Sequence, residues 1–222
     1  MWYAVGRLSV DIASLFITLV VLLFSLTVHE AAHAWSAHRL GDDTAWSLGR
    51  VSLNPAVHID WIGTVVFPLA AMISQVPVIG WAKPVPVNTA RLGHPRRDAA
   101  LVAAAGPASN LVLAVVAALL LRGLAALVAA GRLQDEASGV AYSGTVLQTL
   151  VLSNVMLAIF NLVPLPPLDG GAVVAGMLRG TAAVRFARIR PYGFIVLYGL
   201  MLTGILSMLI SPPARVLLSW LL

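Results

Sequence analysis

The chain has 222 residues, of which 59% are hydrophobic and only 10% are charged. Soluble domains carry about 25% charged residues, so this composition, with a mean hydropathy of +0.91, excludes an ordinary soluble protein and indicates a polytopic membrane protein. The net charge of +5 does not indicate nucleic-acid binding, because the basic residues are few and scattered between apolar runs. The lack of cysteine excludes disulfides and thiolate ligands, so any metal site must use histidines and carboxylates.

The apolar runs predict where the chain crosses the membrane. A spanning helix needs about 20 mostly apolar residues, and the runs that qualify lie at residues 10–39, 99–121, 143–164 and 192–210. Another apolar run, at residues 61–81, is broken by glycine and proline, and we expect it to dip into the membrane and return. The tail at 212–222 is short and is expected at the membrane surface.

The connections after the first helix have a different pattern. Residues 44–60 contain alternating apolar and polar side chains, and residues 82–92 carry two separated prolines, so both are predicted to be extended. We therefore predict an all-α polytopic membrane protein of four to six transmembrane helices, with short β or re-entrant elements between the first two. We expect one domain over residues 1–222, with a core at 10–171 and a C-terminal helix and tail at 172–222.

The basic residues predict which side of the membrane each loop occupies. If the first helix runs from outside to cytosol and residues 61–81 return to the same side, most Lys and Arg residues are cytosolic, as the positive-inside rule requires. A full crossing by 61–81 would weaken this bias. The cytosolic residues would be Arg39, Arg50, Lys83, Arg91, Arg96, Arg97, Arg179, Arg185, Arg188 and Arg190, and the others are Arg7, Arg122, Arg132 and Arg215.

The most distinctive motif is His29-Glu30-Ala31-Ala32-His33, which follows a run, residues 12–28, without any charged side chain. Two histidines four residues apart lie about 40° apart around a helix, so both imidazoles share one face and can bind one zinc ion. Glu30 lies beside that pair and is placed to act as a base. Each charged group near the membrane centre costs about 2.5–3.5 kcal/mol on insertion scales, which favours a metal site over surface decoration.

The expected third zinc ligand is Asp169. A catalytic zinc has three protein ligands and one open position for water, and Asp169 follows the apolar run 143–164 in a segment broken by prolines and glycines. In the topology above, this carboxylate reaches the same side of the membrane as the two histidines. The alternative is an ordinary cap or turn aspartate before Gly170 and Gly171, and the spacing alone does not decide between the two.

These residues predict amide hydrolysis. Zinc lowers the pKa of bound water to about 7 and polarises a carbonyl group. Glu30 could take a proton from the water and pass it to the leaving nitrogen.

The motifs resemble the site-2 protease family of intramembrane zinc metalloproteases. The likeness rests on residues 29–33, 105–110 and 161–171, in the family's order, and residues 80–88 are similar to the compact bacterial and archaeal branch without PDZ or CBS domains. The resemblance implies a zinc ion held by His29, His33 and Asp169, with Glu30 as general base. It also implies that Asn161 holds the substrate or stabilises the oxyanion, and that the substrates are transmembrane proteins.

Three further polar residues have open roles. Asn161 could donate to an oxyanion, or it could make a hydrogen bond between helices. Asn110 follows Gly106, and its role lies equally between function and close helix packing. His58 could approach the zinc, but a loop position bonded to backbone is favoured, because a third ligand is already available.

The sequence therefore predicts an intramembrane zinc metalloprotease that hydrolyses peptide bonds within or near transmembrane segments. The alternative is a non-proteolytic metal-binding membrane scaffold or a transporter. We expect one Zn²⁺ per chain, a transmembrane protein substrate, a lipid bilayer environment and no nucleic-acid partner; the oligomeric state is not predicted. The expected location is a prokaryotic inner membrane, crossed several times, with the active site nearer the cytosol.

Overall fold

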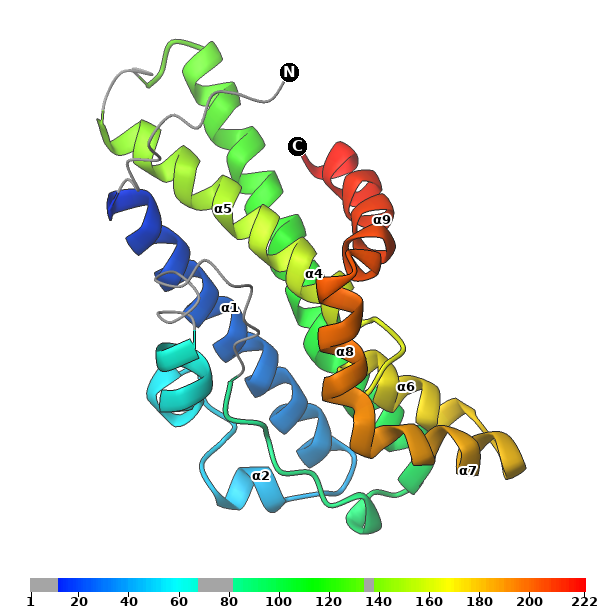
Figure 1. Cartoon of the computed structure of the whole chain (residues 1–222). Coiled ribbons are helices and arrows are strands. Elements are labelled where there is room, and N and C mark those ends of the chain that lie inside the picture. Colours follow the sequence, from blue (N-terminus) through cyan, green and yellow to red (C-terminus); the bar gives the residue numbers. More distant parts are fainter. Residues whose placement is uncertain (1–11, 68–81, 134–137) are drawn as a thin grey trace.

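The computed structural model describes residues 12–67, 82–133 and 138–222, and three long helices dominate it (Figure 1). These are α1 (Ile12–Arg39), α4 (Pro95–Ala129) and α5 (Ser138–Asn161), which pack against one another. All three are long and apolar enough to cross a membrane. Their positions confirm three of the predicted helices, and α4 extends beyond the predicted limits at both ends.

Small side chains let these helices approach closely. Ala114, Ala117 and Ala118 of α4 are buried against Val151 and Val155 of α5. Where lipid surrounds a bundle, helix association depends on such close packing, since apolar side chains gain little by leaving lipid. The bundle is therefore tight at the level of α4 and α5, which fixes the framework that carries the site.

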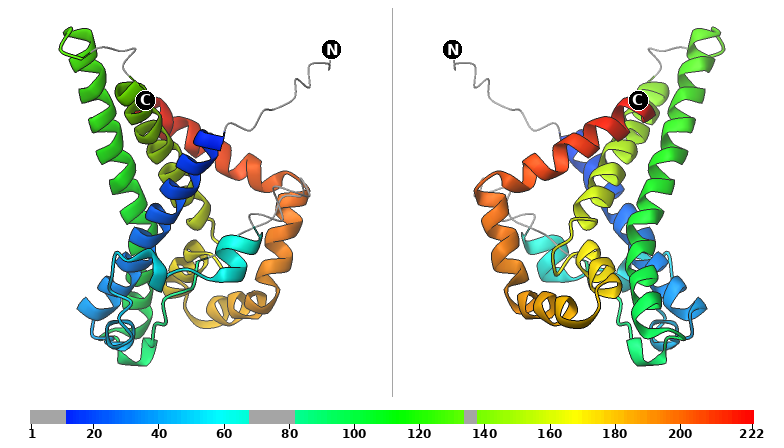
Figure 2. Two further views of the ribbon diagram at one scale, coloured as in Figure 1. Left: turned by 90° about the vertical axis from the view of Figure 1, so that its left-hand side faces the viewer. Right: turned by 90° about the vertical axis from the view of Figure 1, so that its right-hand side faces the viewer.

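The C-terminal part of the protein forms a succession of shorter helices. They are α6 (Asp169–Met177), α7 (Gly180–Ile189), α8 (Gly193–Leu202) and α9 (Ile205–Leu221). Figure 2 shows α8 and α9 as a bent arm that leaves the three long helices and returns to them. The arm contacts the long helices again at Ala214 of α9, which is buried in the core between α4 and α5.

This arm corrects the prediction of one continuous helix at 192–210. The helical segments Gly180–Leu202 and Ile205–Leu221 meet at 77°. Gly204 lies between them with a φ of +76°, a left-handed conformation that ends a helix and that glycine adopts without steric cost. Residues 212–221 of the predicted tail belong to α9, and Pro212 and Pro213 lie inside that helix.

The described residues contain three helices that could cross a membrane, or four if the bent pair is one span. This confirms the all-α polytopic class at the low end of the predicted four to six. The predicted re-entrant run 61–81 begins with a π-helix at Trp61–Val66, and residues 68–81 lie outside the described part.

The short β elements predicted after α1 are wrong for the residues that the structure describes. They contain no strand; the segment holds α2 (Thr44–Ser47) and a 3₁₀ turn at Pro55–Val57. Polar side chains start these turns: Asn54 Oδ1 accepts from the N–H of Ala56, 3.0 Å away. Such local side-chain-to-backbone bonds compete with strand pairing, and the apolar–polar alternation concealed them.

Candidate metal centre

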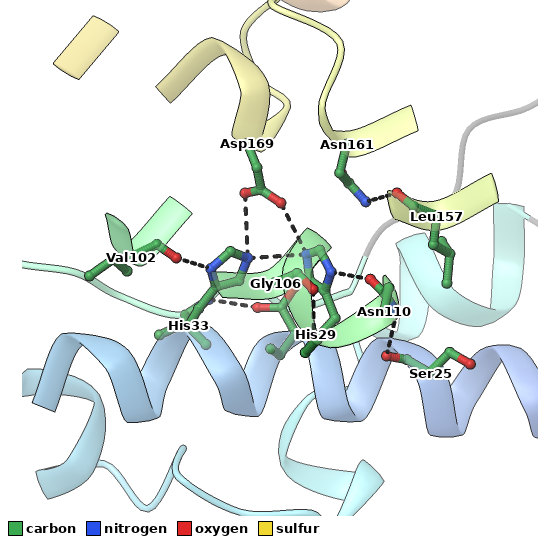
Figure 3. Close-up of polar contacts among 12 residues, drawn as sticks. Ser25, His29, His33, Val102, Gly106, Asn110, Leu157, Asn161 and Asp169 are labelled. Atoms are coloured by element: carbon green, nitrogen blue, oxygen red, sulfur yellow. Dashed lines mark hydrogen bonds and ion pairs between the residues drawn. The ribbon is translucent and has the colours of Figure 1, made fainter. Parts of the chain in front are cut away.

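Three predicted ligands meet where α1, α4 and α6 come together (Figure 3). His29 and His33 lie on one face of α1, and Asp169 is the first residue of α6. The Nε2 atoms of the two histidines are 3.1 Å apart. Asp169 places Oδ2 3.1 Å from His29 Nε2 and Oδ1 3.4 Å from His33 Nε2.

These separations suit zinc. Zinc–nitrogen bonds of about 2.0–2.1 Å in a tetrahedron put neighbouring ligand atoms about 3.3–3.4 Å apart. The two Nε2 atoms are 3.1 Å apart, and each lies 3.1 or 3.4 Å from a different oxygen of Asp169. Among the described residues, these three side chains are the group able to hold a metal ion. The geometry therefore accommodates one ion with little rearrangement.

Hydrogen bonds at the outer nitrogens aim both imidazoles at this point. His33 Nδ1 lies 2.7 Å from the carbonyl oxygen of Val102, and His29 Nδ1 lies 2.6 Å from Asn110 Oδ1. A carbonyl oxygen only accepts, so His33 Nδ1 carries the proton and its Nε2 presents a lone pair. Metal-binding histidines typically have such an outer partner.

The site has an excess of electron pairs that a bound metal ion would balance. Asp169 Oδ2 is buried and has no hydrogen-bond donor in the described part of the chain. A carboxyl group binds a metal ion as the carboxylate, so an ion at this point would supply the partner that Oδ2 lacks.

Gly106 makes the room that the cluster needs. A Cβ atom at this position would lie 2.4 Å from His33 Nε2 and 2.6 Å from His29 Nε2. The sequence suggested only close helix packing around this glycine. Its proximity to both Nε2 atoms depends on how α4 crosses α1, which the spacing of residues within one helix does not reveal.

Glu30 is buried beside the histidines and is held by a distant segment. Its Oε2 atom accepts a hydrogen bond of 3.1 Å from the backbone N–H of Val85.

The segment that contains Val85 is fixed further along by Asp42, whose carboxylate accepts from the N–H of Asn88 at 2.6 Å. Burial alone would raise the pKa of Asp42, but bonds from Thr44 and Asn88 outweigh burial and lower the pKa.

The other predicted residues are placed differently. Asn161 lies near Asp169 in Figure 3, but its Nδ2 donates to the carbonyl oxygen of Leu157, 3.0 Å away on its own helix. His58 Nε2 lies 2.8 Å from the carbonyl oxygen of Ser52, which agrees with the backbone-bonded interpretation. Burial lowers the pKa of His58, despite an opposing effect of that bond.

Sequence reasoning missed Asn154 and Ser25, which are fully buried. Asn154 Oδ1 accepts from Asn110 Nδ2 at 2.8 Å, and Asn154 Nδ2 donates to Ser25 Oγ at 2.9 Å. A usable signal was present, because an amide inside an apolar helix needs a polar partner or a function.

Paired imidazoles, a carboxylate and an adjacent glutamate inside a bundle of apolar helices define the class of intramembrane metalloproteases. Comparison with known proteins identifies the family. The model of "Peptidase family M50" matches residues 124–204, and a Bacillus subtilis protein named "Putative zinc metalloprotease YwhC" is 37% identical over 198 residues, covering 87% of this chain and 83% of the relative. The chain belongs to peptidase family M50, the site-2 proteases, and is a zinc-dependent integral membrane protease.

More distant relatives carry the same kind of name. "Putative zinc metalloprotease Rip2" of Mycolicibacterium smegmatis is 29% identical over 197 residues, covering 83% of this chain and 66% of the relative. The protein of that name from Mycobacterium tuberculosis strain H37Rv is 29% identical over 187 residues, with the same coverage. No solved structure matches this chain significantly.

Proposed function

We propose that this protease cleaves peptide bonds within or near transmembrane segments of membrane proteins, using His29, His33 and Asp169 to hold zinc and Glu30 as general base. The observation that supports it is the convergence of two imidazole nitrogens and one carboxylate, with nearest separations of 3.1–3.4 Å, beside a buried glutamate. We further propose that one domain carries this activity, since Leu168, next to Asp169, packs against Leu197 and Leu206 of the C-terminal helices.

The residues have distinct parts in the proposed reaction. Bound zinc supplies a Lewis acid for the scissile carbonyl and acidifies water. Glu30 takes the proton of the attacking water and delivers it to the leaving nitrogen. Asn161 donates its amide to the carbonyl oxygen of the substrate after releasing Leu157, because an N–H donor near a developing oxyanion lowers the barrier.

The substrate must be partly unwound, because helical carbonyls are already hydrogen-bonded. The extended residues 82–88 are a poor edge for pairing with such a substrate: Lys83, Val85 and Asn88 donate their N–H groups within the chain, and Pro84 and Pro86 have none. Substrate recognition by strand pairing at this segment is therefore disfavoured.

The function is tested by co-expression with tagged single-span membrane proteins. The parent chain is expected to release a shortened fragment, whereas Glu30→Gln is expected to slow release by about 10²–10⁴-fold, the usual contribution of a general base. Fragment size is measured by immunoblotting and mass spectrometry. Equal cleavage by parent and Glu30→Gln would contradict the proposal. No contact given above among the described residues favours the scaffold or transporter alternative.

The proposed side of the active site is cytosolic, in a prokaryotic inner membrane. It rests on the excess of basic residues that the topology places there. The chain has no cysteine, so Arg96→Cys and Arg132→Cys each provide a unique label. We expect a membrane-impermeant maleimide to reach Arg96→Cys only from the cytosolic side and Arg132→Cys only from the other; the reverse result would overturn the topology.

A further inference from the structure

A chain of buried amides connects the metal centre to the backbone of α5. Asn110 on α4 and Asn154 on α5 are both fully buried, and they meet Ser25 of α1. Burying amides without partners is costly, yet each of these has partners. The question is what this arrangement does besides holding three helices together.

The direction of every bond in this chain is fixed from one end. The carbonyl oxygen of Leu150 can only accept, so the atom 2.9 Å from it must be the Nδ2 of Asn154. Asn154 Oδ1 therefore faces Asn110, and it accepts from Asn110 Nδ2 at 2.8 Å. Asn110 Oδ1 is then left to face His29 Nδ1, 2.6 Å away.

The consequence reaches the imidazole of His29. Facing an acceptor, His29 Nδ1 must carry the proton, and in a neutral ring Nε2 is then unprotonated. Nε2 is the atom that lies 3.1 Å from Asp169. His33 needs no such chain, because the carbonyl oxygen of Val102 accepts from its Nδ1 directly.

We propose that Asn154 is a positioning residue that sets the tautomer of His29 through Asn110 and so increases zinc affinity. The proposal rests on the proposed ligand role of His29. Without Asn154, only the longer bond of 3.4 Å from Asn110 Nδ2 to the carbonyl oxygen of Ser25 opposes a turn of that amide, so the orientation with Nδ2 toward His29 becomes more populated. The ring then favours the proton on Nε2, which blocks the metal-binding lone pair.

The first test measures zinc affinity of the purified full-length chain by chelator competition. Asn154→Leu is expected to bind zinc about 10- to 100-fold more weakly, the usual cost of losing an outer partner of a metal ligand. Gln148→Leu is the matched control, since it also replaces an amide side chain by leucine, at an exposed position on α5, and is expected to bind zinc as the parent does.

A double-mutant comparison separates positioning from packing. Asn110→Asp gives His29 Nδ1 a partner that only accepts, whichever way it turns. In that background Asn154→Leu is expected to weaken zinc binding by less than about threefold, because the orientation no longer depends on Asn154. An equal loss in both backgrounds would overturn the proposal, since lost packing acts the same way in each.

A spectroscopic readout on the metal-free chain completes the test. The ¹⁵N shifts of the His29 ring are expected to show the Nδ1-protonated tautomer in the parent and a shift toward the other tautomer in Asn154→Leu. Asn154→Ala serves if leucine prevents folding, as judged by thermal unfolding. An unchanged tautomer overturns the proposal, whereas a parent chain that binds no zinc at all would refute the ligand set itself.

Discussion

The Gly106→Ala variant is expected to lose bound zinc and protease activity together. The added methyl group would lie 2.4 Å from His33 Nε2 and 2.6 Å from His29 Nε2, well inside van der Waals contact. Both imidazoles would have to move away from Asp169, and a misplacement of about 1 Å in an active site typically costs about 10²-fold. We expect zinc content to fall below one tenth of the parent value by elemental analysis, with activity reduced at least ~100-fold.

Gly123→Ala is the matched control for this prediction. It makes the same substitution on the same helix, where nothing lies within 4 Å of the new Cβ. We expect this variant to retain zinc and activity, with a small gain in stability from better helix propensity. If Gly106→Ala keeps its zinc while folding normally, the cluster is not where the metal binds.

Asp169→Asn is expected to remove zinc, whereas Glu30→Gln is expected to leave it bound. The substitution at 169 replaces an anionic ligand by a neutral amide at the point where two lone pairs already meet, 3.1 Å apart. Glu30 instead bonds the backbone of Val85 and is not among the grouped ligand atoms. Both variants should lose activity. Glu30→Gln should lose about 10²–10⁴-fold, and the activity of Asp169→Asn should fall in proportion to its loss of zinc.

Metal content therefore distinguishes a ligand from a base. Zinc per chain is measured after gentle purification, with Asp43→Asn as a control that changes an exposed carboxylate and should retain both zinc and activity. Full zinc occupancy in Asp169→Asn would mean that another residue is the third ligand. Loss of zinc from Glu30→Gln would mean that this glutamate belongs to the metal site itself.

The proximity of the three proposed ligands could be predicted because the signals are local. The spacing of His29 and His33 on one helix fixes their common face, and Asp169 stands out as a carboxylate at the end of an apolar run. Asn154 carried a usable signal, an amide inside an apolar helix, but its partner and the role of Gly106 arise only when α4 and α5 pack against α1. Such contacts between distant segments follow from crossing geometry, which a single sequence does not contain.

The fold shows the same division between local and long-range information. Apolar length predicted α1, α4 and α5, since crossing a membrane imposes that length. The predicted strands failed because side chains such as Asn54 and Asp60 cap short turns, which outweighs a weak alternation. The bend at Gly204 was missed because one glycine within an apolar run does not predict a left-handed backbone conformation.

The carboxylate of Asp42 has a consequence for how this scaffold tolerates change. It accepts hydrogen bonds from the N–H groups of Thr44 and Asn88. The long connecting segment between these two residues therefore starts and ends at the same carboxylate. Extra length within such a closed segment adds little entropy cost, because loop-closure entropy grows only slowly with loop size. We therefore expect added residues there to leave unchanged the spacing of the two helices that carry the histidines and Gly106.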